Sequence, residues 1–146
     1  MRWGSLTCKS PEYMVTLAVE ALQEANQRGV ILEGLFKLSM DLLQKATTDK
    51  DLISYAETNI CFIEMTPHGW LFSRVAAVVH HGSAGTINTS LRSGVPTIIT
   101  PIFLDQFDMS YVIEELGVGV GFSKQFQQIT AKELGYAIKR VLEGQK

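Results

Sequence analysis

The sequence has few cysteines and no cluster of positive charge. Only Cys8 and Cys61 are cysteines among 146 residues. Two cysteines without metal-ligand spacing indicate reduced thiols, so we expect a cytoplasmic protein without a zinc site or a disulfide framework. The formal net charge is −2. Because nucleic-acid-binding domains usually carry a basic patch, we expect no nucleic acid partner.

Long apolar runs are also missing. No stretch approaches the roughly 20 apolar residues that span a bilayer, so we expect no transmembrane segment. Residues 1–3 lead into polar residues, and no apolar signal-peptide core follows. Hydrophobic residues make up 46% of the chain and charged residues 19%. This composition is typical of a globular protein, and the length predicts a single domain over residues 1–146.

Apolar runs and helical patterns alternate along the chain. We expect strands at about 30–32, 60–63, 75–79, 97–100 and 118–122, and helices at about 11–28, 35–43, 85–93, 108–116 and 130–143. The pattern assigns no helix or strand between the polar break at 47–50 and residue 58. This alternation predicts an α/β fold, a Rossmann-like parallel sheet with helices on both faces. Because only three residues precede the turn at Gly4 and Ser5, we expect the chain to begin late in its first strand.

The most informative motif follows the strand expected at 75–79. His80 and His81 end this strand, and the small residues Gly82-Ser83-Ala84-Gly85-Thr86 lead into a helix. Small residues allow the backbone to approach a ligand closely. The first N–H groups of a helix are unpaired, and the helix dipole there favours an anion. The motif therefore predicts a phosphate or diphosphate site.

A second polar pair follows the next expected strand. Asp105 and Gln106 interrupt the apolar run that begins at Pro101. A carboxylate beside an amide supplies acceptors and donors for neighbouring hydroxyl groups. Both loops would lie at the carboxyl ends of strands, where α/β sheets bind ligands. Diphosphate at one loop and hydroxyls at the next indicate a nucleotide sugar.

These motifs resemble a known family. The run HHGSAGTINTSLRSGVPTIITPIFLDQFD, residues 80–108, resembles the donor-binding signature of family 1 glycosyltransferases, which have the two-domain GT-B architecture. The preceding PHGWLFSRVAAVVHHG is similar to the sterol 3-beta-glucosyltransferase branch, although Gly69 stands where that branch carries an acid. WGSL, residues 3–6, resembles the loop that begins the C-terminal domain of that family.

The resemblance implies a role for several residues. The implied diphosphate ligands are His80, Ser83, Ala84, Gly85 and Thr86; the implied sugar ligands are Asp105 and Gln106; and Thr66, Pro67 and His68, with Gly4 and Ser5, would line the uridine site or the domain interface. The donor would be a UDP-sugar, with UDP-glucose favoured, and no metal or other cofactor is expected. Asn88 stands where plant relatives carry a ribose-binding Glu, and their base-stacking Trp has no counterpart here.

The resemblance also implies an inverting mechanism in which the catalytic base lies on an N-terminal acceptor domain. We find no candidate for this base in the chain, so we expect no catalytic residue here and no activity from the chain alone. Contact with a membrane surface would come through the missing part.

Other interpretations stay open. His80 could be a strand-end histidine bonded to a neighbouring carbonyl, Asp105 could be a helix N-cap, and Trp70 is more typical of core packing. The chain could also belong to an N-acetylglucosaminyl or other GT-B transferase, or be a non-catalytic module that binds nucleotide sugars or a partner. A dinucleotide-binding domain is disfavoured, because Gly117 to Gly121 follow a helix instead of preceding one.

Overall fold

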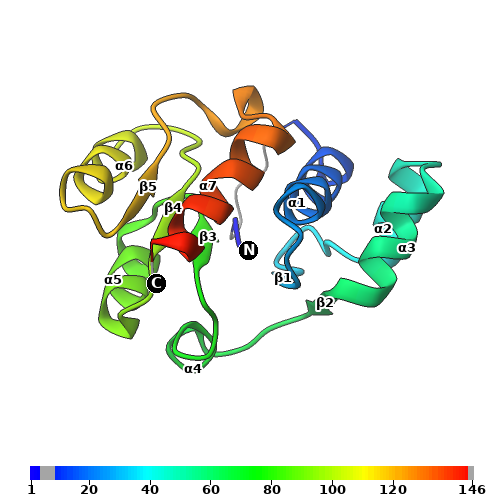
Figure 1. Cartoon of the computed structure of the whole chain (residues 1–146), viewed down its shortest axis with the longest axis horizontal. Coiled ribbons are helices and arrows are strands. Elements are labelled where there is room, and N and C mark those ends of the chain that lie inside the picture. The colour runs from blue at the N-terminus through cyan, green and yellow to red at the C-terminus, as the bar shows by residue number, and fades with distance from the viewer. Residues whose placement is uncertain (4–8, 145–146) are drawn as a thin grey trace. The chain divides into compact units, whose positions relative to one another are not determined.

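The computed structural model describes residues 1–3 and 9–144, in which helices alternate with short strands (Figure 1). The strands are β1 (Gly29–Leu32), β2 (Ile60–Ile63), β3 (Val78–His80), β4 (Thr97–Ile99) and β5 (Gly119–Gly121). The helices are α1 (Pro11–Ala25), α2 (Met40–Ala46), α3 (Lys50–Asn59), α4 (His68–Phe72), α5 (Ala84–Ser93), α6 (Gln106–Glu115) and α7 (Ala131–Glu143), with a 3-10 turn η1 at Phe126–Gln128.

The chain divides into two compact units. Unit 1 comprises Met1–Met65 and Thr130–Tyr136, and unit 2 comprises Thr66–Ile129 and Ala137–Lys146. Each unit has its own parallel sheet, because β1 pairs with β2 whereas β4 pairs with both β3 and β5. The parallel pairing and the flanking helices confirm the predicted α/β class.

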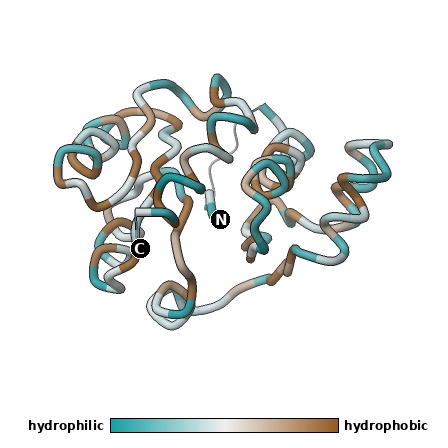
Figure 2. Tube along the Cα trace, viewed as in Figure 1, coloured by the Kyte–Doolittle hydropathy of each residue, from teal (hydrophilic) through white to brown (hydrophobic). Residues whose placement is uncertain are grey.

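Unit 1 is held together by an apolar face of α1. Ser10 caps this helix by accepting the N–H of Tyr13 at 3.1 Å, and Pro11 occupies the first turn, as the sequence predicts. Met14, Ala18 and Leu22 are among its buried residues. Figure 2 shows hydrophobic and hydrophilic segments alternating along the helices, the pattern by which one face of a helix is buried.

The end of α1 and the region after β1 differ from the sequence expectation. Helix α1 stops at Ala25, because Asn26 adopts a left-handed conformation with φ 53° and caps it, while Gly29 starts β1. The helix expected at 35–43 begins later, at Met40. Helix α3 was not expected at all; Asp49 caps it by accepting the N–H groups of Asp51 and Leu52. This helix buries only Leu52 and Ala56, so its sequence carries few apolar positions at helical spacing.

The parallel register of unit 2 aligns the ends of its strands. Val79 lies opposite Ile98, and His80 lies opposite Ile99, so β3 and β4 end at the same edge of the sheet. Helix α6 packs against β4 and β5, and α5 packs against β4. Ile87 of α5, Ile99 of β4 and Ile113 of α6 form a buried cluster. This packing fixes where α5 and α6 begin relative to that edge.

Among the described residues, no helix is long and apolar enough to cross a membrane. In the same residues, no group of three His, Cys, Asp or Glu side chains is arranged to hold a metal ion.

We predict that Tyr55→Phe destabilises unit 1 by about 1 kcal/mol, the usual net value of a hydrogen bond. The Tyr55 hydroxyl lies 3.0 Å from the carbonyl oxygen of Leu22 and 2.7 Å from that of Gln27, and it ties α3 to the end of α1. Urea unfolding of the two proteins measures the difference. Tyr136→Phe is the matched control, because the Tyr136 side chain is 71% exposed and should change the free energy of unfolding by less than about 0.5 kcal/mol.

Tyr55→Phe should also change how the folding stability depends on pH. Burial of the side chain raises the pKa of Tyr55. The folded chain therefore holds this proton more tightly than the unfolded chain, and stability should fall as the pH rises above about 10. The Phe variant should lose this part of the alkaline destabilisation, whereas Tyr136→Phe should keep it.

Candidate functional site

The predicted diphosphate motif forms the turn between β3 and α5. His80 ends β3, Gly82 follows with a φ of 97°, and Ser83 stands at the N-cap of α5. A residue with a side chain rarely adopts such a φ, so the glycine allows the chain to leave the strand and enter the helix within three residues. The strand–turn–helix arrangement predicted for this motif is confirmed.

His80 is fully buried at the centre of this turn. Its Nδ1 accepts the backbone N–H of Gly82 at 3.0 Å, and its carbonyl oxygen accepts the backbone N–H of Thr100 at 3.0 Å. Because Nδ1 is an acceptor, the proton of the neutral imidazole lies on Nε2. The ring thus braces the turn by accepting a backbone N–H group at Nδ1. A direct role in phosphate binding stays a prediction, with Nε2 as the donor.

The N-terminus of α5 is not capped by a side chain. The Ser83 hydroxyl makes no cap hydrogen bond and instead lies 2.9 Å from the Thr86 hydroxyl. Ala84 and Gly85 are exposed, whereas Thr86 is buried. The first-turn N–H groups of an uncapped helix are available to an anion, and the dipole of this ten-residue helix favours negative charge there.

Gly82 brings the two predicted loops into contact. A Cβ atom built on Gly82 would lie 2.8 Å from Cγ2 of Ile99 and 3.5 Å from both Cβ and the carbonyl oxygen of Gln106. The turn after β3 therefore packs directly on the end of β4 and the start of α6. Sequence reasoning placed both loops at one sheet edge, and this contact places them side by side.

The Gln106 side chain holds the loop before α6 in place through hydrogen bonds to its backbone. It is 4% exposed, and its Oε1 accepts the backbone N–H of Ile102 at 2.8 Å and that of Phe103 at 3.2 Å. The amide oxygen is therefore engaged by its own loop. Only the amide N–H₂ group can serve a sugar hydroxyl, which narrows the predicted role of Gln106 to that of a donor.

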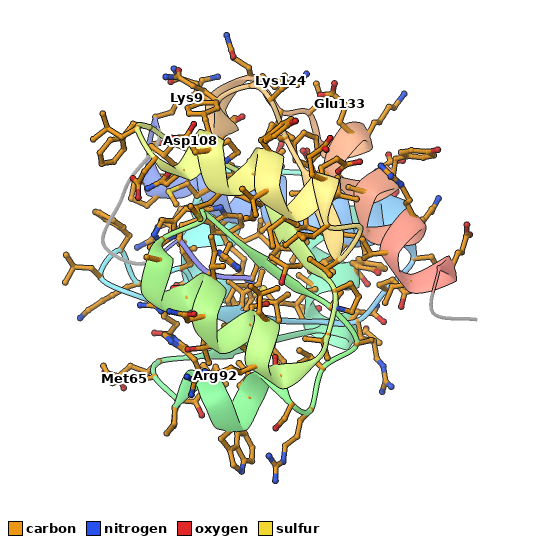
Figure 3. All side chains as sticks on the ribbon, turned by 90° about the vertical axis from the view of Figure 1, so that its left-hand side faces the viewer. Lys9, Met65, Arg92, Asp108, Lys124 and Glu133 are labelled. Carbon is orange, nitrogen blue, oxygen red and sulfur yellow. The ribbon has the colours of Figure 1, made fainter. Side chains whose placement is uncertain are left out.

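Asp105 is exposed at the N-cap of α6 but makes no side-chain cap hydrogen bond. Its backbone is helical, with φ −59° and ψ −15°, unlike the extended backbone of a usual capping residue. The capping interpretation thus lacks its hydrogen bond, and the carboxylate is accessible. Figure 3 shows a second carboxylate of the same helix, Asp108, and Arg92 on α5 as labelled side chains.

The predicted uridine residues lie at the start of α4. Pro67 stands at its N-cap, and the His68 ring stacks on Phe72 with centroids 5.3 Å apart. Trp70 was expected to pack in the core, but it is 54% exposed and lies under the Arg74 guanidinium, while its neighbours Leu71 and Phe72 are buried. Thr66 is half-buried. Gly4 and Ser5 lie outside the described residues.

A hollow of about 640 Å³ lies elsewhere in unit 2. Pro96, which precedes β4, and Val118, which precedes β5, line it together with the 3.0 Å ion pair of Arg140 and Glu114. It therefore lies at the amino ends of the strands. Because open α/β sheets bind their ligands at the carboxyl ends, we do not assign the nucleotide site to it.

The family model described as the erythromycin biosynthesis protein CIII-like, C-terminal domain matches residues 31–146. The chain belongs to this family. It is thus a family 1 glycosyltransferase-like domain, as the motifs at His80 and Asp105 indicate.

Curated relatives extend the match. The chain is 39% identical over 132 residues to a sterol 3-beta-glucosyltransferase of Kluyveromyces lactis, and 38% identical over 135 residues to one of Saccharomyces cerevisiae. These matches cover 90% and 92% of the chain but only 10% and 11% of the two relatives. The chain thus spans about a tenth of their length.

Solved structures share the fold. The glycotransferase of kitacinnamycin superposes with a TM-score of 0.70 at 22% identity, covering 97% of this chain and 33% of that protein. Os79 from O. sativa, in complex with UDP, gives a TM-score of 0.78 at 17% identity, covering 98% and 31%. These identities establish the fold alone, which is that of the C-terminal domain of a GT-B glycosyltransferase.

Sequence reasoning missed two residues that build the site. Gly82 was noted only as a small residue, although a glycine between a buried strand and a helix is a signal for a positive φ. Thr100 gave no separate signal, yet its backbone N–H and its hydroxyl both bond to the His80 carbonyl, the hydroxyl at 3.3 Å. Both residues act through contacts between the turn after β3 and the end of β4. Patterns read along a single segment of sequence do not show such contacts.

We predict that Gly82→Ala destabilises unit 2 by about 1–3 kcal/mol more than Gly94→Ala, because the new methyl group collides with Ile99. Gly94 is the matched control: its φ of 71° is also positive, but a Cβ there meets nothing within 4 Å. Thermal or urea unfolding measures both. Equal destabilisation would show that the contact between the two loops contributes nothing beyond backbone strain.

Proposed function

We propose that this chain binds a UDP-sugar, with UDP-glucose favoured, as the donor-binding domain of an inverting sterol glucosyltransferase. One observation carries the proposal: an uncapped helix N-terminus and an exposed carboxylate lie on two loops joined at Gly82. The first suits a diphosphate, and the second suits sugar hydroxyls. A UDP-sugar presents these two groups in succession.

In the proposed reaction, the turn between β3 and α5 stabilises the leaving diphosphate. A base on the acceptor domain takes the proton of the acceptor hydroxyl as its oxygen attacks the anomeric carbon from the side opposite the diphosphate. The bond from that carbon to the diphosphate oxygen breaks, and the diphosphate leaves with the electron pair. The first N–H groups of α5 and the Nε2–H of His80 stabilise the developing negative charge. Because Nδ1 accepts from Gly82, His80 acts as a neutral donor here.

The remaining parts of the reaction lie outside this site. The acceptor base and most of the sterol pocket are proposed to come from an N-terminal acceptor domain of the same enzyme, which would also make any membrane contact. The likeness to the sterol 3-beta-glucosyltransferases of Kluyveromyces lactis and Saccharomyces cerevisiae supports a sterol as acceptor. A GT-B transferase for another sugar or acceptor shares the same donor loops and stays the second candidate.

We predict that the chain binds UDP and UDP-glucose weakly and does not bind NAD. Isothermal calorimetry or ligand-observed NMR with millimolar ligand measures this. His80→Ala should weaken UDP binding by about 1–3 kcal/mol, the cost of losing a hydrogen bond to a charged group. Since His80 also braces the turn, circular dichroism must first show that the variant is folded; His80→Gln, which keeps a donor amide, should recover part of the affinity. Folded wild-type chain without UDP binding would refute the proposal.

We predict that Asp105→Ala weakens the binding of UDP-glucose by roughly 1.5–3 kcal/mol, because a charge-assisted bond to sugar hydroxyls is lost. The binding of UDP should be nearly unaffected. Asp108→Ala is the matched control, an exposed carboxylate in the first turn of the same helix. It should change neither affinity. The melting temperature should stay close to that of the wild type for Asp105→Ala, since this carboxylate makes no cap bond. Equal losses for the two ligands would remove Asp105 from the sugar site.

A further inference from the structure

Two large apolar side chains are exposed directly before the predicted sugar ligand. Leu104 is 74% exposed and Phe103 is 41% exposed, and Asp105 follows at once. Leu104 also has a φ of 53°, in the left-handed region. The loop between β4 and α6 thus places two exposed apolar residues next to an accessible carboxylate.

A leucine is an unfavourable residue for both of these properties. The left-handed region brings its Cβ close to the following carbonyl oxygen, and a leucine has no polar side chain to form a compensating local bond. Exposure leaves its apolar surface in water. Strained backbone conformations of this kind cluster at ligand-binding sites, so the conformation is a reason to ask what Leu104 contacts.

The loop is held in place by hydrogen bonds at both ends. Gln106 Oε1 accepts the N–H groups of Ile102 and Phe103, and the carbonyl oxygen of Leu104 accepts the N–H of Phe107 at 3.2 Å. The carbonyl oxygen of Pro101 accepts the N–H of Phe126 at 2.7 Å. The apolar side chains therefore project from a fixed loop.

We propose that Phe103 and Leu104 contact the apolar body of a lipophilic acceptor and so contribute to acceptor specificity. This inference rests on the proposed function. If Asp105 holds the transferred sugar, the acceptor hydroxyl must reach the anomeric carbon of that sugar, so the acceptor body lies within a few ångströms of the same loop. Residues 103 and 104 supply apolar surface there, and contact with a sterol-like acceptor would remove that surface from water.

Leu104→Gly tests this role without damage to the backbone, because glycine adopts a φ of 53° freely. Lys37→Gly is the matched control, since Lys37 is another non-glycine residue with a positive φ, 50°, in a loop of unit 1. The probe is a photoreactive cholesterol analogue with a free 3-hydroxyl and a diazirine on the ring system close to that hydroxyl. It is delivered from cyclodextrin to the chain in the presence of saturating UDP, and labelled peptides are identified by mass spectrometry.

We expect saturable labelling of the peptide that contains residues 101–107. Leu104→Gly should reduce the apparent affinity about fivefold, as expected for partial burial of one leucine side chain. Its UDP affinity should not change, and its melting temperature should be equal to or above that of the wild type. Lys37→Gly should leave the labelling unchanged.

The outcomes separate this inference from the proposed function. Bound UDP without labelling at 101–107, or labelling that Leu104→Gly leaves unchanged, overturns the acceptor contact alone. Sterol-free phosphatidylcholine vesicles form a second arm: if Leu104→Gly weakens binding to these vesicles and not the sterol labelling, the loop contacts a lipid surface and the inference is wrong. A folded chain that does not bind UDP overturns the proposed function and this inference with it.

Discussion

The candidate site depends on the contact between the turn after β3 and the start of α6. Parallel pairing of His80 with Ile99 ends both strands at one edge, but this alone would leave two separate loops. Gly82 closes the distance, because only a residue without a side chain fits against Ile99 and Gln106. The positions of the α5 N-terminus, the Asp105 carboxylate and the rigid loop before it all follow from this contact.

The polar groups of the site divide into those that build it and those that remain accessible. His80 and Gln106 were both predicted as ligands, and both use one side-chain atom to fix backbone N–H groups of their own loops. Asp105 and the first turn of α5 have no such internal bond from a side chain. A buried group that organises a loop and an exposed group that meets a ligand need different residue types, and the motif supplies both.

Sequence patterns were most informative where local chemistry decides the structure. The capping of α1 by Ser10, the five strands and the strand–turn–helix motif at His80 were predicted, because apolar runs, capping residues and glycines act over a few neighbours. Helix α3 was missed because it buries only Leu52 and Ala56 and its contacts with α1 are distant in sequence. Trp70 was misplaced for a related reason: the run Trp70-Leu71-Phe72 is apolar throughout, and only the helix geometry decides which side chain stays outside.

The tautomer of His80 constrains how leaving-group charge can be stabilised. Protonating Nδ1 would break its bond to the Gly82 N–H, so this bond belongs to the neutral ring. A neutral ring keeps this bond and leaves its Nε2–H as the proposed donor to the diphosphate. The positive potential that a diphosphate requires must then come chiefly from the α5 dipole and its uncapped N–H groups. This explains why the turn places small residues, rather than lysine or arginine, where the phosphates are proposed to bind.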